Sequence, residues 1–189
     1  MWDRLDSCFE IQEQGVHTMV GGTAEDEGWV DPSLMVDGDD LLLFYLPGVI
    51  GSDPAGCPPG EETCIKEIRS ARTDPDSFPS FTVVPGARVE QFVGVPPEEL
   101  GGFSDPDIVP LQDGSYLLYV SSGENTLGYV GDDPNGSFEI PGGGSEPLFV
   151  SRQQGGVPSA IEDESSGEVW LYVHRSENDS GTVIRRAVS

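Results

Sequence analysis

The chain has 189 residues, of which 34 are acidic and 9 are basic, so its formal net charge is −25 and its isoelectric point is about 4.1. Nucleic acids and anionic membranes are bound through Lys and Arg side chains that neutralise phosphate, so this charge argues against both as partners. No apolar stretch approaches the roughly 20 residues that span a bilayer.

Residues 1–28 contain one or two candidate strands in "SCFEIQEQGVHTMVGG", but no hairpin of the kind found further along the chain. The first ten residues lack the basic start and the apolar stretch of a signal peptide. We therefore expect either a cytoplasmic start or a sequence that begins after the true start of the gene product. Cys8 is left unassigned.

Residues 29–100 form the first repeated unit. It opens with "DPSLMVDGDDLLLFY" from Asp31, in which an Asp-Gly turn between two apolar runs predicts a β-hairpin. A Pro/Gly-rich loop follows, in which Cys57 and Cys64 either close a disulfide or remain as two free thiols. The runs "IRSARTDPDSF" and "FTVVPG" are the predicted third and fourth strands.

Residues 101–150 and 151–189 repeat this pattern. The second unit has "DPDIVPLQDGSYLLY" from Asp105, then "LGYVGDDPNGSF" and "FEIPG" as its third and fourth strands. The third has "VPSAIEDESSGEVWLY" from Val157, which keeps the proline but not the aspartate, and "IRRAVS" as its third strand. Its fourth strand is missing.

The three units predict an all-β fold, a β-propeller built from consecutive four-stranded antiparallel blades, the last one incomplete. A two-sheet sandwich with similar hairpins is the alternative, but it leaves the repeated proline unexplained. Natural propellers have at least four blades, so we expect either a piece of a longer protein or a chain that closes its ring by oligomerisation. Residues 1–28, 29–100, 101–150 and 151–189 would all belong to one propeller domain.

These motifs resemble those of the five-bladed propellers of the arabinanase, xylosidase and invertase superfamily, most nearly glycoside hydrolase family 43. The resemblance covers Trp29 to Ser189. It implies a five-bladed ring and hydrolysis of glycosidic bonds of a polysaccharide or oligosaccharide with inversion. Such hydrolysis needs a general base and a general acid, two carboxyl groups that lie about 6.5–9.5 Å apart.

The resemblance assigns roles to particular residues. Asp31 falls on the general-base position, with the alternative that it only shapes the turn before Pro32, and Trp29 would stack on a sugar. Asp105 falls on the position of the aspartate that raises the pKa of the acid, unless Asp107 matches the second blade's own aspartate instead. In this assignment Asp31 and Asp105 are catalytic, and Trp29, Phe103 and Asp107 bind the substrate in the central pocket.

The general acid has no match in the sequence. In the family it is a glutamate two residues before the proline of its blade, and this position in the last unit is Gly156. If the unit corresponds to the family's third blade, Val157 takes the place of the expected aspartate. Because a carboxylate is lost in either alignment, the sequence leaves open whether the protein is an enzyme.

A non-catalytic propeller that binds a glycan or a protein at the same central mouth is therefore the second hypothesis. No cofactor is expected and the sequence has no metal motif, although a structural calcium ion in the central channel is compatible with the resemblance. His174 is expected to pack on its strand. The dispersed acidic residues predict a solvated acidic surface, or else a specific cation-binding surface. The predicted location is extracellular or periplasmic, and the oligomeric state is open.

Overall fold

The structure is a computed structural model that describes residues 27–49, 67–73, 81–90, 103–144, 148–151, 155–177 and 181–189. It contains three antiparallel sheets, which we call blades A, B and C. Blade A consists of β1 (Glu27–Asp37), β2 (Asp40–Val49), β3 (Glu67–Thr73) and β4 (Thr82–Glu90). Blade B consists of β5 (Ser104–Pro110), β6 (Tyr116–Ser122), β7 (Asn125–Gly131) and β8 (Leu148–Ser151). Blade C consists of β9 (Gly156–Glu162), β10 (Val169–Glu177) and β11 (Gly181–Val188).

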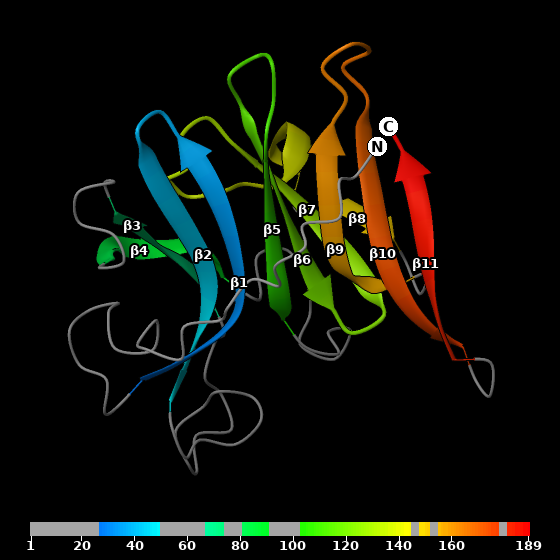
Figure 1. Cartoon of the computed structure of the whole chain (residues 1–189), viewed down its shortest axis with the longest axis horizontal. Helices are drawn as coiled ribbons and strands as arrows, with labels where there is room; N and C mark the ends of the chain where they lie inside the picture. The colour runs from blue at the N-terminus through cyan, green and yellow to red at the C-terminus, as the bar shows by residue number, and fades with distance from the viewer. Residues whose placement is uncertain are drawn as a thin grey trace, which may run out of the picture.

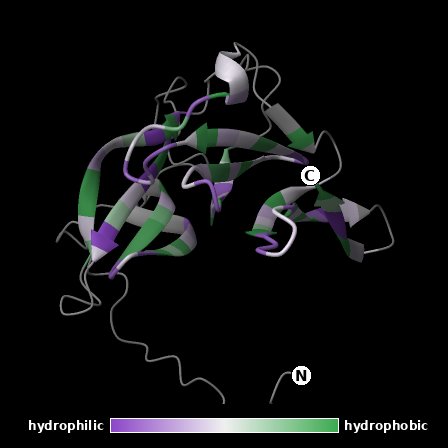
Figure 2. Ribbon diagram, turned by 90° about the horizontal axis from the view of Figure 1, so that it is seen from above, coloured by the Kyte–Doolittle hydropathy of each residue, from purple (hydrophilic) through white to green (hydrophobic). Residues whose placement is uncertain are grey.

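The three blades stand side by side with their first strands together, as in a propeller. The first strands of the three blades lie next to one another, since β1 contacts β5 and β5 contacts β9 (Figure 1). Seen from above, the sheets follow one another along an arc that is open on one side (Figure 2). The predicted all-β propeller architecture is confirmed.

Apolar side chains fill the space between the blades. In a strand, successive side chains point to opposite faces, so a strand between two neighbouring sheets is apolar on both. In β6, Leu118 and Val120 pack toward blade A, and Tyr119 packs toward blade C. The core between blades A and B consists of Met35, Leu42, Phe44, Leu46, Ile68, Val89, Phe103, Ile108, Leu118, Val120, Leu127, Tyr129, Phe138 and Ile140.

The fourth strand of blade B is not where the sequence predicts it. The "FEIPG" segment forms only an isolated bridge between Glu139 and Val130, followed by a short 3-10 helix over Pro141–Gly143. The strand that pairs with β7 is β8. Proline has no N–H to donate to a sheet, and Pro141 ends the extended segment after Ile140.

The "FEIPG" segment instead fills the space between blades A and B. The Phe138 N–H donates to the Arg88 carbonyl of β4 at 2.7 Å, and its ring meets Phe44 of β2 edge to face at 6.5 Å. Phe138 is 3% exposed. The segment therefore joins two blades and adds its aromatic side chain to their common core.

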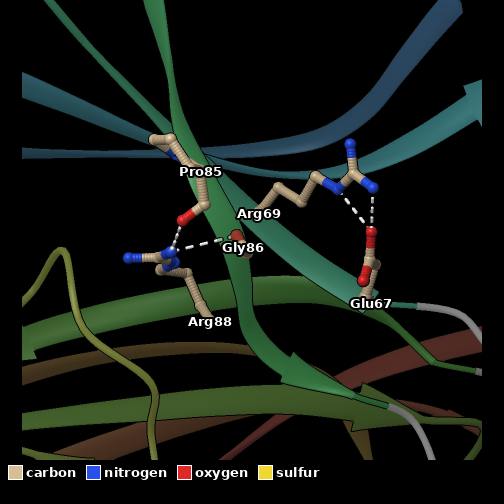
Figure 3. A network of polar contacts seen from close by, with 5 residues as sticks. All are labelled: Glu67, Arg69, Pro85, Gly86 and Arg88. Atoms are coloured by element: carbon tan, nitrogen blue, oxygen red, sulfur yellow. Dashed lines mark hydrogen bonds and ion pairs between the residues drawn. The ribbon is translucent and has the colours of Figure 1, made fainter.

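A wide bulge in β4 is held by an arginine of the same strand. Only Arg69 of β3 lies opposite the four residues from Pro85 to Arg88, because the register shifts between Ile68 and Ser70. The Arg88 guanidinium closes the bulge by donating from Nη2 to the carbonyls of Pro85 and Gly86, at 2.7 and 2.9 Å (Figure 3). Arg69 pairs separately with Glu67.

The predicted hairpins are present. Gly38 and Gly114 have φ angles of 62° and 88° in the turns that follow β1 and β5, as tight Asp-Gly turns require. The described residues do not include Cys8, Cys57, Cys64 or the strands expected before residue 27. The domain boundaries stay a prediction. In the part of the chain that the structure describes, no helix is long and apolar enough to cross a membrane.

Candidate functional site

The first strand of each blade contains the same irregularity near its start. In blade A, Asp31 and Pro32 together lie opposite Tyr45, so the pairing register shifts there. The same two-against-one bulge occurs at residues 105–106 and at residues 157–158. A β-bulge turns a side chain away from the direction that a regular strand would give it. The repeated proline therefore marks a repeated bulge.

The residue before each of these prolines has a left-handed backbone. The φ angles are 55° at Asp31, 48° at Asp105 and 50° at Val157, and these are the non-glycine residues with positive φ in the described part of the chain. This conformation is unfavourable for L-residues, and its occurrence at three equivalent positions indicates a shared structural requirement. Because β1 contacts β5 and β5 contacts β9, the three positions lie at corresponding places of neighbouring strands, a region that we call the well.

Two of the three positions of the well carry carboxylates. Asp31 and Asp105 are both partly buried. The Ser104 hydroxyl donates to Asp105 Oδ2 at 2.8 Å. Carboxylates in this setting can accept hydrogen bonds from hydroxyl groups or take a proton from water.

The third position is held in place by blade B. The Val157 N–H donates to Ser121 Oγ at 3.2 Å, the Gly155 N–H donates to the Glu124 carbonyl at 3.0 Å, and the Thr126 hydroxyl donates to the Gly155 carbonyl at 3.0 Å. The Val157 side chain nevertheless remains 48% exposed. The surrounding structure therefore fixes an apolar, β-branched residue in a conformation that it disfavours.

The position before Val157 has no room for a side chain. A Cβ atom on Gly156 would lie 2.3 Å from Ser121 Oγ and 2.5 Å from the Gly123 carbonyl oxygen. Gly156 is therefore required by packing and does not replace a glutamate that this blade could otherwise hold. Blade C follows blades A and B directly, and its alignment with the family's third blade, with Val157 in place of the aspartate, stays a prediction.

Phe103 does not line the well. It is 0% exposed and belongs to the core between blades A and B, so the expected contact with a ligand is wrong. Its apolar ring is better buried than exposed, and the start of β5 places it between two sheets. Trp29 lies in β1, where its backbone pairs with Pro47, and its side chain is outside the description.

Asp107 lies two residues beyond Asp105 and contacts both neighbouring blades. Its Oδ2 accepts the Ala160 N–H of β9 at 2.6 Å, and its Oδ1 accepts the Ser33 hydroxyl of β1 at 3.4 Å. Burial raises the pKa of this carboxyl to about 6, although both hydrogen bonds lower it. Its expected role in binding substrate stays a prediction.

Sequence reasoning missed the groups that hold the well together. The hydroxyls of Ser33, Ser121 and Thr126 come from different strands and have no common motif. The Gly155–Gly156 pair before Pro158 is a sequence feature that could have indicated the close contact with blade B, since paired glycines before a strand often permit close approach of two backbones. Among the described residues, no group of three His, Cys, Asp or Glu side chains could hold a metal ion, so the calcium expectation finds no ligand set there.

A hollow lies at the ends of β5 and β9 that are opposite to the well. It has a volume of about 550 Å³ and is lined by residues 108–112 of blade B and by Ala160, Ile161, Glu162 and Glu164 of blade C. The Gln112 N–H donates to Glu162 Oε2, and its amide group donates to the Glu164 carbonyl, both at 2.8 Å. These contacts join the hairpins of two blades, so we place the candidate site at the well.

Several solved structures with a similar arrangement of strands are glycoside hydrolases. A family 117 glycoside hydrolase from the marine bacterium Zobellia galactanivorans superposes with a TM-score of 0.60 at 16% identity, over 87% of this chain and 53% of that chain. An endo-1,4-β-xylanase from Bacteroides thetaiotaomicron gives 0.61 at 17% identity, over 87% and 48%. A novel α-L-arabinofuranosidase from Clostridium thermocellum gives 0.51 at 23% identity, over 84% and 55%.

The chain thus spans about half the length of these structures, and at this level of identity the likeness concerns the fold. The fold is that of the five-bladed propeller glycoside hydrolases, of which the chain forms three consecutive blades. No family model matches the sequence, and no curated protein matches it.

Proposed function

We propose that the protein is a carbohydrate-active propeller, a glycoside hydrolase of the family 43 kind, that binds a polysaccharide or oligosaccharide at the well. The repeated left-handed residue before Pro32 and Pro106 supports this proposal, because Asp31 and Asp105 occupy equivalent bulges of neighbouring first strands. The shared propeller fold of glycoside hydrolases supports it. Fold alone does not determine activity, so the argument depends on the site.

In the proposed reaction, Asp31 is the general base. Its carboxylate takes a proton from a water molecule as that water attacks the anomeric carbon, while a carboxylic acid protonates the leaving oxygen. Attack from the face opposite the leaving group inverts the configuration. Asp105 is the second negative group at the mouth, and its charge stabilises the positive charge that develops on the sugar ring.

The general acid is assigned to a further blade of the ring. The outer face of blade A exposes Leu34 and Val36, and the outer face of blade C exposes Ile161, Ile184 and Val188. Apolar sheet faces of this kind are normally covered, and the superposed part of this chain spans only about half of the similar structures. Additional blades on these faces would complete both the core and the site.

Hydrolysis is tested with a panel of aryl glycosides on the wild-type protein and on Asp31→Asn. We expect the substitution to reduce kcat by at least ~100-fold, because the amide cannot accept the proton. Asp132→Asn, which removes an exposed carboxylate outside the well, is the matched control. NMR of the first product anomer tests inversion. Turnover that Asp31→Asn leaves unchanged would exclude Asp31 as the base.

The second candidate is a propeller that binds a glycan without cleaving it. Val157 favours it, because an apolar side chain stands where the family has an aspartate. In this case the wild-type protein shows no turnover but binds oligosaccharides in calorimetry, and Asp31→Asn weakens that binding.

We also propose that the protein is secreted, since Cys57 and Cys64 in one short loop suit an oxidising compartment.

A further inference from the structure

Asp107 stands at the middle of the three first strands. It belongs to β5, which contacts β1 on one side and β9 on the other. Its two bonding partners also lie just beyond the well: Ser33 follows Asp31 by two residues, and Ala160 follows Val157 by three. One carboxylate therefore contacts a residue near each of the other two positions of the well.

The contact with blade C is the stronger of the two. A charged acceptor at 2.6 Å from a backbone N–H makes a short, charge-assisted hydrogen bond, whereas the 3.4 Å contact with the Ser33 hydroxyl is long. The Ala160 N–H points away from β10, because it donates to another blade. Since β9 is an edge strand of its sheet, Asp107 binds an N–H group that the sheet itself does not use.

We propose that Asp107 is a positioning residue, which joins the first strands of all three blades and thereby fixes the relative positions of Asp31, Asp105 and Val157 around the well. Among the described strands, no backbone ladder connects β5 to β1 or to β9, since the three belong to separate sheets. At their far ends β5 and β9 are joined by Gln112 and Glu162. On the side of the well, where β6 and β7 of blade B also bind the start of β9, Asp107 is the side chain of β5 that contacts both β9 and β1.

Keeping this carboxylate ionised opposes folding. Its pKa of about 6 in the folded protein lies above the ordinary value of 3.8, so the folded chain binds the proton more tightly than the unfolded chain. Stability therefore falls as pH rises from about 4 to about 6, and the loss persists at higher pH. Of the titratable groups near Asp107, Asp105 lies two residues earlier on β5 and Asp31 lies on β1, while burial and the charge of Asp107 raise the pKa of Tyr119 on β6.

The first test compares Asp107→Asn with the wild-type chain in urea unfolding between pH 5 and pH 8. The amide keeps an acceptor for the Ala160 N–H but carries no charge. We expect the unfolding equilibrium constant of the wild type, relative to the variant, to rise roughly 10-fold over this range, as the titration of a single buried carboxyl dictates. Asp132→Asn is the control and should show no such change.

The second test measures position rather than stability, because removing a buried charge can stabilise a protein whatever its role. In Asp107→Ala, amide hydrogen exchange should become at least ~10-fold faster at Ala160 and at the starts of β1, β5 and β9. The Leu118 amide, in the ladder of β6, should be unchanged. Asp107→Asn should restore slow exchange at Ala160, and Ser33→Ala should accelerate exchange at the start of β1 only.

These outcomes decide the proposal, which does not depend on whether the well hydrolyses its ligand. Unchanged exchange at Ala160 in Asp107→Ala would overturn it, and so would a uniform increase over all described strands. A difference between Asp107→Asn and the wild type that stays constant with pH would overturn it as well. If Asp107→Ala does not fold, the pH dependence of Asp107→Asn and the exchange at the start of β1 in Ser33→Ala still decide the proposal. Loss of turnover in Asp31→Asn with normal exchange at Ala160 would concern the proposed function alone.

Discussion

Val157 combines three properties that seldom occur together in one residue. It is β-branched, it has a φ angle of 50°, and its side chain is 48% exposed. A left-handed conformation costs an L-residue about 1–2 kcal/mol, and a branched side chain is poorly suited to it. Because little apolar surface is buried in return, the strain is maintained by the hydrogen bonds of the neighbouring segment with blade B.

Val157→Asn is therefore expected to stabilise the protein by about 1 kcal/mol, since asparagine tolerates left-handed backbone better than valine does. Urea unfolding measures the change. Val36→Asn is the control, because Val36 is also exposed, at 68%, but does not have a positive φ angle. A lower stability of Val157→Asn than of the wild type would show that the valine side chain makes favourable contacts with its surroundings.

At the residue scale, the sequence identified positions better than roles. The prolines marked the positions of Asp31, Asp105 and Val157, because a proline within a strand has no N–H for the ladder and so indicates a bulge or an edge. It could not show that Phe103 is buried, since an aromatic residue at a strand start suits a pocket and a core equally well. The contacts of Asp107 were hidden because its partners are 74 and 53 residues away in the chain.

At the scale of the elements, the connection between β7 and β8 differs most from its prediction. The apolar "FEI" run has the composition of a strand, yet the structure uses Phe138 and Ile140 as core residues between blades A and B. Phe138 also lies against Gly131, where a Cβ atom would come within 3.1 Å of its ring. An apolar pattern shows that a segment is buried, but it does not show which partner it pairs with.

Phe138→Ala should destabilise the protein by about 3–5 kcal/mol, because it leaves a cavity between two blades. Glu139→Ala, on the exposed neighbour in the same segment, is the control and should change stability by less than about 0.5 kcal/mol. Thermal unfolding of the two variants measures both effects. Similar small losses in both would mean that blades A and B are held together mainly by contacts other than those of Phe138.

At the scale of the whole molecule, the hairpin turns, the number of sheets and the order of strands in blade A follow from the sequence pattern. The sequence features that predict them are local: Gly38 and Gly114 adopt the positive φ angles of the turns, and the apolar runs on either side have strand length. The way in which the blades meet is not local. It depends on contacts between distant segments, such as the Ser121 hydroxyl with the Val157 N–H and the Arg88 carbonyl with the Phe138 N–H.

The net charge of −25 leads to a prediction for the whole molecule. Like charges repel more strongly in the compact state, and salt screens them, so the melting temperature should rise between about 0.01 and 0.5 M NaCl. KCl and LiCl at equal ionic strength should act similarly if the acidic surface is simply solvated. A comparable rise in melting temperature with millimolar CaCl₂ would instead reveal a specific cation-binding surface.

The recurrence of one bulge in successive blades also has a consequence for protein engineering. The side chains at residues 31, 105 and 157 extend from bulges with the same left-handed backbone. In blade C, the glycine and the hydroxyl group that shape this bulge belong to other residues. In the proposed function, recognition and folding are therefore encoded at different positions. A combinatorial library restricted to residues 31, 105 and 157 is then expected to alter ligand selectivity while leaving the fold intact.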